Sequence, residues 1–144
     1  MTSLDADLVR RKLAAITRKL DQLGTVAGMP LDRYVADPFR VKGTEKLLQE
    51  TVEAAVDANL HLLRAVGTPA PTDYYESFVA LGRQSIIPQV LAERLAPAAG
   101  LRNRLVHEYE DINDAIVLAA VGEARASFSE YVVAVERFLE EQGS

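Results

Sequence analysis

Apolar residues near the start of the chain recur at steps of three and four, the period of a helix with one buried face. They are Leu4, Leu8, Val9, Leu13, Ile16, Leu20 and Leu23. The spacing predicts an amphipathic helix over roughly Asp5 to Leu23, which Gly24, Gly28 and Pro30 then end.

The opposite face of this predicted helix is basic. Its cations are Arg10, Arg11, Lys12, Arg18 and Lys19. A charge run of this kind is usually a solvated helix face, and we interpret it so. Contact with RNA or with an acidic partner is the alternative that the sequence leaves open.

A longer stripe predicts a second helix from about Lys42 to Val66. Its members are Leu48, Val52, Ala55, Val56, Asn59, Leu63 and Val66. Because a buried amide must be hydrogen-bonded, Asn59 is interpreted as a core residue rather than a catalytic one. Residues 29–43 are expected to be irregular, with Pro38 and Gly43 as breakers. A short packed turn is expected there from Leu31, Tyr34, Val35 and Phe39.

A second stripe on the same predicted helix is charged. It contains Glu50, Glu53, Asp57, His61 and Arg64. Asp57 and His61 are four residues apart and can touch on a helix. We expect a solvent-side ladder of charges; the alternative is that Asp57 faces the arginine motif described below and orients it.

After a proline-containing loop over residues 67–73, a short helix is predicted over Tyr74–Arg83. Tyr74 and Tyr75 are interpreted as packing residues, with base stacking as the alternative. A further helix is predicted from about Gln89 through residue 109. Pro97 and Gly100 both disfavour helix, so a kink or break is expected near residues 97–100.

Asp111 is the expected N-cap of a last helix over residues 112–141. Its expected packing side is Ile116, Ala119, Ala120, Phe128, Tyr131, Val135, Phe138 and Leu139. No β-hairpin signal or repeat interrupts the five helical segments. The sequence therefore predicts an all-α protein, an antiparallel helical bundle forming a single domain over residues 1–144.

Composition narrows the function. The chain has no cysteine and two histidines, so a disulfide framework or a thiolate metal site is excluded and a metal centre is not expected. A net charge of −5 argues against a protein that coats nucleic acid non-specifically, but it permits a local basic cleft. No apolar run approaches the roughly 18 to 20 residues of a membrane span, and no signal core precedes the first helix, so we expect a cytoplasmic protein.

The candidate chemistry lies in one nine-residue stretch, residues 101–109. Arg102 precedes His107 by five positions, and Tyr109 follows two positions later. Arginine offers a planar fork of donors to a phosphate, histidine moves protons near pH 7, and a tyrosine hydroxyl can accept a transferred group. These residue types in one stretch favour chemistry on a phosphate ester.

The same stretch resembles the signature of HEPN-domain ribonucleases, which is an arginine, four to six residues, then a histidine. It is more similar to the HepT subgroup, whose pattern ends in a histidine, one residue and a tyrosine; here these are Arg102, His107 and Tyr109. Asn103 directly after the arginine is common in that group. Residues 93–97 and 53–61 also look like that family, so the resemblance covers nearly the whole chain.

An ideal straight helix would not bring these groups together. Five residues turn through about 500°, so Arg102 and His107 would point about 140° apart. The helix could fray after His107 and let the histidine and Tyr109 swing. Alternatively, two copies could pair so that one cleft holds both arginines and both histidines. The resemblance implies the second, because HEPN ribonucleases use a dimeric cleft.

The resemblance implies metal-independent RNA cleavage. His107 is hypothesised to act as a general base on the ribose 2′-OH or as an acid for the leaving oxygen. Arg102 is hypothesised to hold the phosphate, and Asn103 to position Arg102 or the phosphate. The competing hypothesis is a non-catalytic nucleotide-binding or accessory module of a nucleotidyltransferase complex.

The resemblance also implies a partner. HepT-type toxins pair with a small nucleotidyltransferase antitoxin, MntA-like, in type VII toxin–antitoxin systems. That partner is implied to transfer AMP from ATP to the motif tyrosine, here Tyr109. The AMP phosphate would compete with RNA for Arg102.

Overall fold

The computed structural model describes residues 4–143, and in that range it contains α-helices, one short 3-10 helix and no strand. The prediction of an all-α bundle is confirmed. The elements are α1 (Ala6–Leu23), α2 (Leu31–Val35), α3 (Pro38–Ala65), α4 (Tyr74–Arg83), α5 (Gln89–Leu95), α6 (Pro97–His107), η1 (Tyr109–Asp111) and α7 (Asp114–Glu141). None of these helices is long and apolar enough to cross a membrane.

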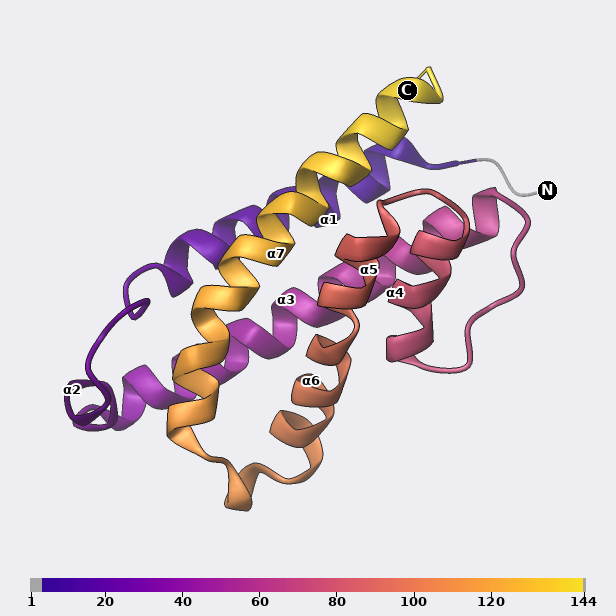
Figure 1. The fold of residues 1–144 in the computed structure, drawn as a ribbon. Helices are drawn as coiled ribbons and strands as arrows, with labels where there is room; N and C mark the ends of the chain where they lie inside the picture. The colour runs from indigo at the N-terminus through magenta and orange to yellow at the C-terminus, as the bar shows by residue number, and fades with distance from the viewer. Residues whose placement is uncertain (1–3, 144) are drawn as a thin grey trace.

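Three long helices form the frame of the molecule. Figure 1 shows α1 running beside α7, with α3 crossing next to both. The shorter helices α4 and α6 pack against α3, and α5 packs against α4 and α7. Helix α6 leads through η1 into the start of α7. The helix that carries the candidate motif therefore lies between α3 and the turn that begins α7.

The basic side chains of α1 join it to its neighbours. Arg10 Nη2 lies 2.9 Å from Glu136 Oε1 on α7, and Lys12 Nζ lies 3.1 Å from Asp57 Oδ2 on α3. Lys19 makes a third, looser ion pair with α3, 3.8 Å from Glu50. The predicted solvated face is therefore wrong for these three cations, whose carboxylate partners come from sequence-distant helices.

Helix α3 begins at Pro38, four residues before the predicted start, so reading Pro38 as a breaker was wrong. Proline fits the first helical position because its missing N–H needs no partner there. Asp37 caps the helix by accepting from Phe39 N at 2.9 Å. The expected turn before it is α2, but only Tyr34 of its predicted packing residues is buried, and Phe39 is 88% exposed.

The predicted break near Pro97 is confirmed. Helix α5 ends at Leu95, and α6 begins at Pro97, while Gly100 lies inside α6. The predicted N-cap of α7 is wrong, because Asp111 belongs to η1. Asn113 performs the capping, accepting from Ala115 N at 3.0 Å and from Ile116 N at 3.2 Å. Among the expected packing residues of this helix, Ile116 and Ala119 are exposed.

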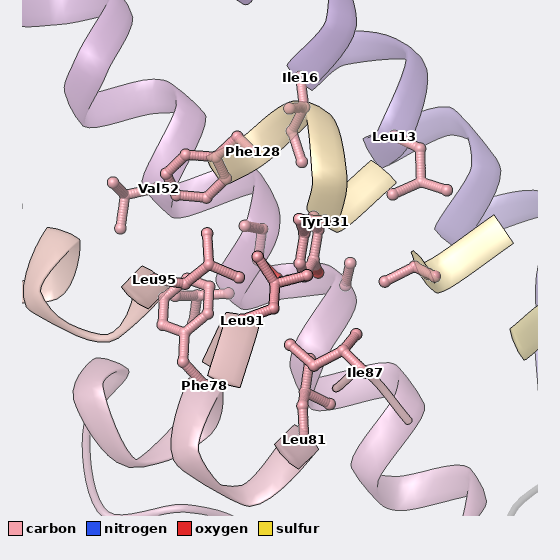
Figure 2. Close-up of a cluster of buried hydrophobic side chains, with 14 of the residues drawn as sticks. Leu13, Ile16, Val52, Phe78, Leu81, Ile87, Leu91, Leu95, Phe128 and Tyr131 are labelled. Atoms are coloured by element: carbon pink, nitrogen blue, oxygen red, sulfur yellow. The ribbon is translucent and has the colours of Figure 1, made fainter. Parts of the chain in front are cut away.

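The core is centred on three aromatic rings (Figure 2). Phe78, Phe128 and Tyr131 meet edge to face, with centroids 6.1 to 6.3 Å apart. Beside them Tyr131 Oη donates to Asn59 Oδ1 at 2.6 Å, and Asn59 Nδ2 donates to Ser77 Oγ at 3.1 Å. Asn59 is fully buried, so its interpretation as a satisfied core residue is confirmed. These contacts fix α3, α4 and α7 to one another.

Candidate active site

Helix α6 carries three of the candidate residues: Arg102, Asn103 and His107. It ends at His107, and the cap residue Glu108 donates its backbone N–H to Arg104 O at 2.9 Å. His107 and Asn103 are exposed. Helix α6 therefore ends directly after the histidine, and the 3-10 helix η1 follows it. Tyr109 begins η1; its side chain lies outside what the structure describes.

Arg102 is held by a carboxylate from α3. Its Nε and Nη2 atoms donate to Glu53 Oε2 at 3.1 and 2.8 Å. On the other side of the guanidinium, Nη1 donates to Asn103 Oδ1 at 3.3 Å. The Arg102 side chain is only 18% exposed, which is low for an arginine. A cation buried to this degree needs a partner, and Glu53 supplies it.

Two more side chains complete this surrounding. The Arg102 guanidinium carbon lies 4.7 Å from the centroid of the Tyr74 ring, within the range of a cation–π contact. Gln49 Nε2 donates to the two carboxylate oxygens of Glu53 at 3.3 and 3.5 Å. The candidate phosphate-binding arginine is thus part of a chain of contacts that runs from α3 to α6 and α4.

Glu53, not Asp57, faces the motif arginine. The sequence offered Asp57 for that role, but Asp57 pairs with Lys12 of α1 instead. The two carboxylates lie one helical turn apart on the charged stripe, so the pattern alone does not separate them. The packing of α6 against the earlier turn of α3 decides it. The interpretation of Tyr74 as a packing residue holds in part, because its ring packs on Arg102.

An apolar pocket of about 190 Å³ lies next to this arginine, between α3, α6 and α7. Its walls are mostly aliphatic, from residues such as Leu101 and Leu105, with Arg102 and Arg104 at its edge. His107 is not among its lining residues. The pocket therefore borders the arginine half of the motif, and Arg102 and His107 do not share it.

A cation at the pocket edge is fixed by carboxylates of α7. Arg94 donates to Glu130 and, at 3.5 Å, to Glu123. The hydrogen bond with Glu130 raises the pKa of Arg94 above its ordinary value, so this side chain stays charged. Among residues 4–143 there is no group of three or more histidine, aspartate or glutamate side chains that could hold a metal ion.

A helical bundle that carries an arginine and a histidine of this spacing on one short helix is the organisation of a HEPN-type nuclease domain. The chain belongs to the HepT-like ribonuclease family: the family described as "Ribonuclease HepT-like" matches residues 15–135.

Two relatives align over most of their length. A protein of Aphanizomenon flos-aquae, described as "tRNA nuclease HepT", is 35% identical over 139 residues, covering 96% of this chain and 95% of the relative. A protein of Shewanella oneidensis, described as "mRNA nuclease HepT", is 29% identical over 127 residues, covering 88% and 94%. The chain therefore spans nearly the full length of both relatives.

Solved structures share the fold. A toxin–antitoxin complex with AMP-PNP contains a chain with a TM-score of 0.83 and 26% identity. The tri-AMPylated Shewanella oneidensis HEPN toxin in complex with MNT antitoxin gives 0.82 and 27%. Each comparison covers 91% of this chain and 98% of the other. A Bacillus subtilis protein, YutE, has the same fold at a TM-score of 0.85 with only 11% identity.

Proposed function

We propose that this chain is the toxin of a type VII toxin–antitoxin system, an endoribonuclease that cuts RNA such as tRNA or mRNA without a metal ion. The observation that carries the proposal is the different exposure of the two motif residues on α6, in a chain that belongs to this family. Arg102 is partly buried and paired with Glu53, while His107, five residues later, is exposed where the helix ends. The Arg102 guanidinium is thus held in a fixed position, and the His107 imidazole is accessible to solvent and substrate.

The reaction that suits these groups is attack by the ribose 2′ oxygen on the adjacent phosphorus. His107 accepts the 2′-OH proton, the O2′–P bond forms, and the P–O5′ bond breaks with protonation of the leaving oxygen. The products are a 2′,3′-cyclic phosphate and a 5′-hydroxyl. Arg102 stabilises the extra negative charge on the phosphate, and Asn103, at 3.3 Å from it, positions the guanidinium or the phosphate.

The cleft is proposed to form between two copies of the chain. On an ideal helix Arg102 and His107 point about 140° apart, so one copy does not aim both at one atom. A two-fold pair of α6 helices supplies two arginines and two histidines to a shared cleft. Each Arg102 then pairs with the His107 of the other copy, so the cleft holds two such pairs. The histidine of one pair accepts the 2′-OH proton and passes it on to the leaving oxygen.

The test uses the chain's two histidines as a matched pair. Purified protein is incubated with tRNA and with a transcribed mRNA in EDTA, and cleavage is followed on gels. His107→Ala should lose activity, whereas His61→Ala on α3 should retain it. Cleavage ends are then analysed for 2′,3′-cyclic phosphate. Inactivity of the unmodified protein on every RNA would instead favour the non-catalytic binding module.

Regulation is proposed to act on Tyr109 through a nucleotidyltransferase antitoxin, MntA-like, that transfers AMP from ATP. Support comes from the similar solved toxin, which is tri-AMPylated and bound to its MNT antitoxin. Tyr109 starts η1 two residues after His107, so an attached AMP would bring a phosphate close to the motif. There it would compete with RNA for the arginine donors.

Intact mass spectrometry after co-expression with an MntA-like nucleotidyltransferase tests this regulation. The chain should gain mass in AMP units, and Tyr109→Phe should gain none and remain toxic beside the partner. A chain that is silenced while its Tyr109 stays unmodified would contradict AMPylation and leave blockade by binding alone.

A further inference from the structure

The guanidinium of Arg102 contacts three side chains, two of which come from other helices. Glu53 of α3 lies at one edge of the guanidinium, the guanidinium carbon lies over the Tyr74 ring of α4, and Nη1 donates to Asn103. We propose that Glu53 and Tyr74 are positioning residues, which orient Arg102 for the scissile phosphate. This inference rests on the ribonuclease function proposed above.

An arginine side chain has two edges that can bind an oxyanion through two donors. One edge is formed by Nε and Nη2, and the other by Nη1 and Nη2. Glu53 Oε2 accepts from both atoms of the first edge, at 3.1 and 2.8 Å. The second edge remains for a phosphate, with Asn103 Oδ1 next to its Nη1 end at 3.3 Å. The contact with Glu53 thus determines which donors face the RNA and where they point.

The Tyr74 ring restricts the remaining motion. The guanidinium carbon lies over the ring, 4.7 Å from its centroid, and this attractive contact opposes movement of the Arg102 side chain away from the ring. Tyr74 is itself anchored, since Ser77 Oγ donates to Tyr74 O at 2.8 Å and receives from buried Asn59 Nδ2 at 3.1 Å. The orientation of the arginine is therefore tied to the protein core.

The Glu53 carboxylate has an electrostatic effect opposite to its geometric one. It offsets the charge of Arg102 and repels an approaching phosphate, so by itself it weakens RNA binding. A carboxylate that only balanced charge would suppress the enzyme, whereas one that orients the arginine raises the rate of the chemical step. Removing Glu53 should therefore strengthen RNA binding and slow the chemical step. Both KM and kcat should fall.

The experiment measures kcat and KM for tRNA cleavage with Glu53→Ala, Glu53→Gln and the control Glu50→Ala. Glu50 lies one turn earlier on α3 and pairs with Lys19, away from the motif. For Glu53→Ala we expect kcat to fall about ten- to a hundredfold, because misplacement by about 1 Å has that effect. KM should fall about two- to threefold with the lost repulsion.

Glu53→Gln separates the two effects. The amide keeps an oxygen acceptor for Arg102 but carries no charge. Its KM should match that of Glu53→Ala, while its kcat should be clearly higher. Glu50→Ala should leave both constants unchanged. Melting temperatures of all three variants are measured alongside, because a purely structural role would lower them and reduce active protein without lowering KM.

Tyr74→Leu tests the ring, with Tyr75→Leu as its neighbour control. Tyr75 is 52% exposed and lies on the same turn of α4. Leucine keeps apolar bulk at position 74 but removes the π face, so kcat should fall several-fold only in Tyr74→Leu. An independent readout is the 15N NMR signal of Arg102 Nε–H, which should lose its protection from exchange in Glu53→Ala.

The outcomes distinguish a failure of the positioning role from a failure of the proposed ribonuclease function. If Arg102→Ala abolishes cleavage while Glu53→Ala keeps both wild-type constants, the positioning role is wrong and the ribonuclease proposal stands. A rise of kcat in Glu53→Ala would make Glu53 an inhibitory counter-ion and overturn the proposal. If wild-type protein and Arg102→Ala are equally inactive on RNA, the proposed function itself fails.

Discussion

The hydroxyl of Tyr131 has one proton and two acceptors, Asn59 Oδ1 at 2.6 Å and Ala55 O at 3.1 Å. The side chain is fully buried between α3 and α7. At the residue scale this is the polar centre of an otherwise apolar core, and it also leads through Asn59 and Ser77 to the backbone of Tyr74. The stability of the bundle and the geometry of the candidate site share these hydrogen bonds.

Tyr131→Phe should lower the free energy of unfolding by about 1 to 3 kcal/mol, since it leaves buried acceptors without a donor. Urea denaturation measures this value. Tyr75→Phe is the control, and as a change on an exposed side chain it should stay within about 0.5 kcal/mol. Equal stability of both variants would mean that the buried hydroxyl contributes nothing net.

Tyr131 should also make the stability of the fold depend on pH in the alkaline range. Burial raises the pKa of Tyr131 above its ordinary value of 10.0. The unfolded chain therefore releases this proton at a lower pH than the folded chain, and the stabilisation present below pH 10 is lost as pH rises. The free energy of unfolding should decline more steeply above about pH 10 in the wild type than in Tyr131→Phe. Parallel declines would contradict this origin.

At the scale of the elements, the sequence predicts helices well where their ends carry unambiguous signals. The α4 bounds Tyr74–Arg83 match because Asp73, after a loop with two prolines, caps the helix and accepts from Glu76 N at 2.8 Å. The starts of α3 and α7 were misplaced because Pro38 can begin a helix as well as break one, and Asp111 and Asn113 are equally good caps.

The candidate site shows the same limit. The sequence places Arg102, Asn103 and His107 on one helix because their spacing is local. It does not identify Glu53 as the partner of Arg102, because the two are 49 residues apart and the choice between Glu53 and Asp57 depends on how α6 packs on α3. Such pairs depend on tertiary packing, and the spacing of residues along the sequence does not identify them.

Two glycines should respond oppositely to alanine because of helix packing. A Cβ at Gly82 on α4 would lie 2.7 Å from Ala92 Cβ and 3.2 Å from Gln89 Cα, so α4 and α5 would have to separate. Gly82→Ala should destabilise by about 1 to 3 kcal/mol. At Gly122 on α7 nothing lies within 4 Å, and alanine should stabilise by about 0.5 to 1 kcal/mol.

Thermal unfolding followed by circular dichroism checks both changes under one condition. A stabilised Gly82→Ala protein would show that the close approach of α4 to α5 is not needed. Because neither Gly82 nor Gly122 takes part in the contacts around Arg102 described above, activity should follow the folded fraction only.

At the scale of the whole molecule, the proposed dimer makes Arg102→Ala and His107→Ala complementary. Each variant alone lacks one group in every cleft, but a mixed dimer holds one arginine and one histidine from opposite copies. If catalysis pairs groups across the dimer, co-expression should restore about a quarter of wild-type activity, since half the dimers are mixed and each holds one of two sites.

Light scattering provides the control for this experiment. Each preparation should have twice the 15.8 kDa mass of one chain at micromolar concentration. A monomer would contradict the shared cleft. Mixed dimers without activity would show that each active pair comes from a single copy.

The break before Pro97 also affects how the molecule opens. Helix α6 has 11 residues, of which only Ala99 and Leu105 are buried, and no side-chain cap at its start. A helix this short has little stability of its own, and proline passes no amide hydrogen bond back to α5. Its amides should exchange with solvent sooner than those of α3 and α7, as a separate cooperative unit. A ligand that binds to α6 and opposes its local unfolding, whether RNA or antitoxin, would then slow deuterium uptake in this segment.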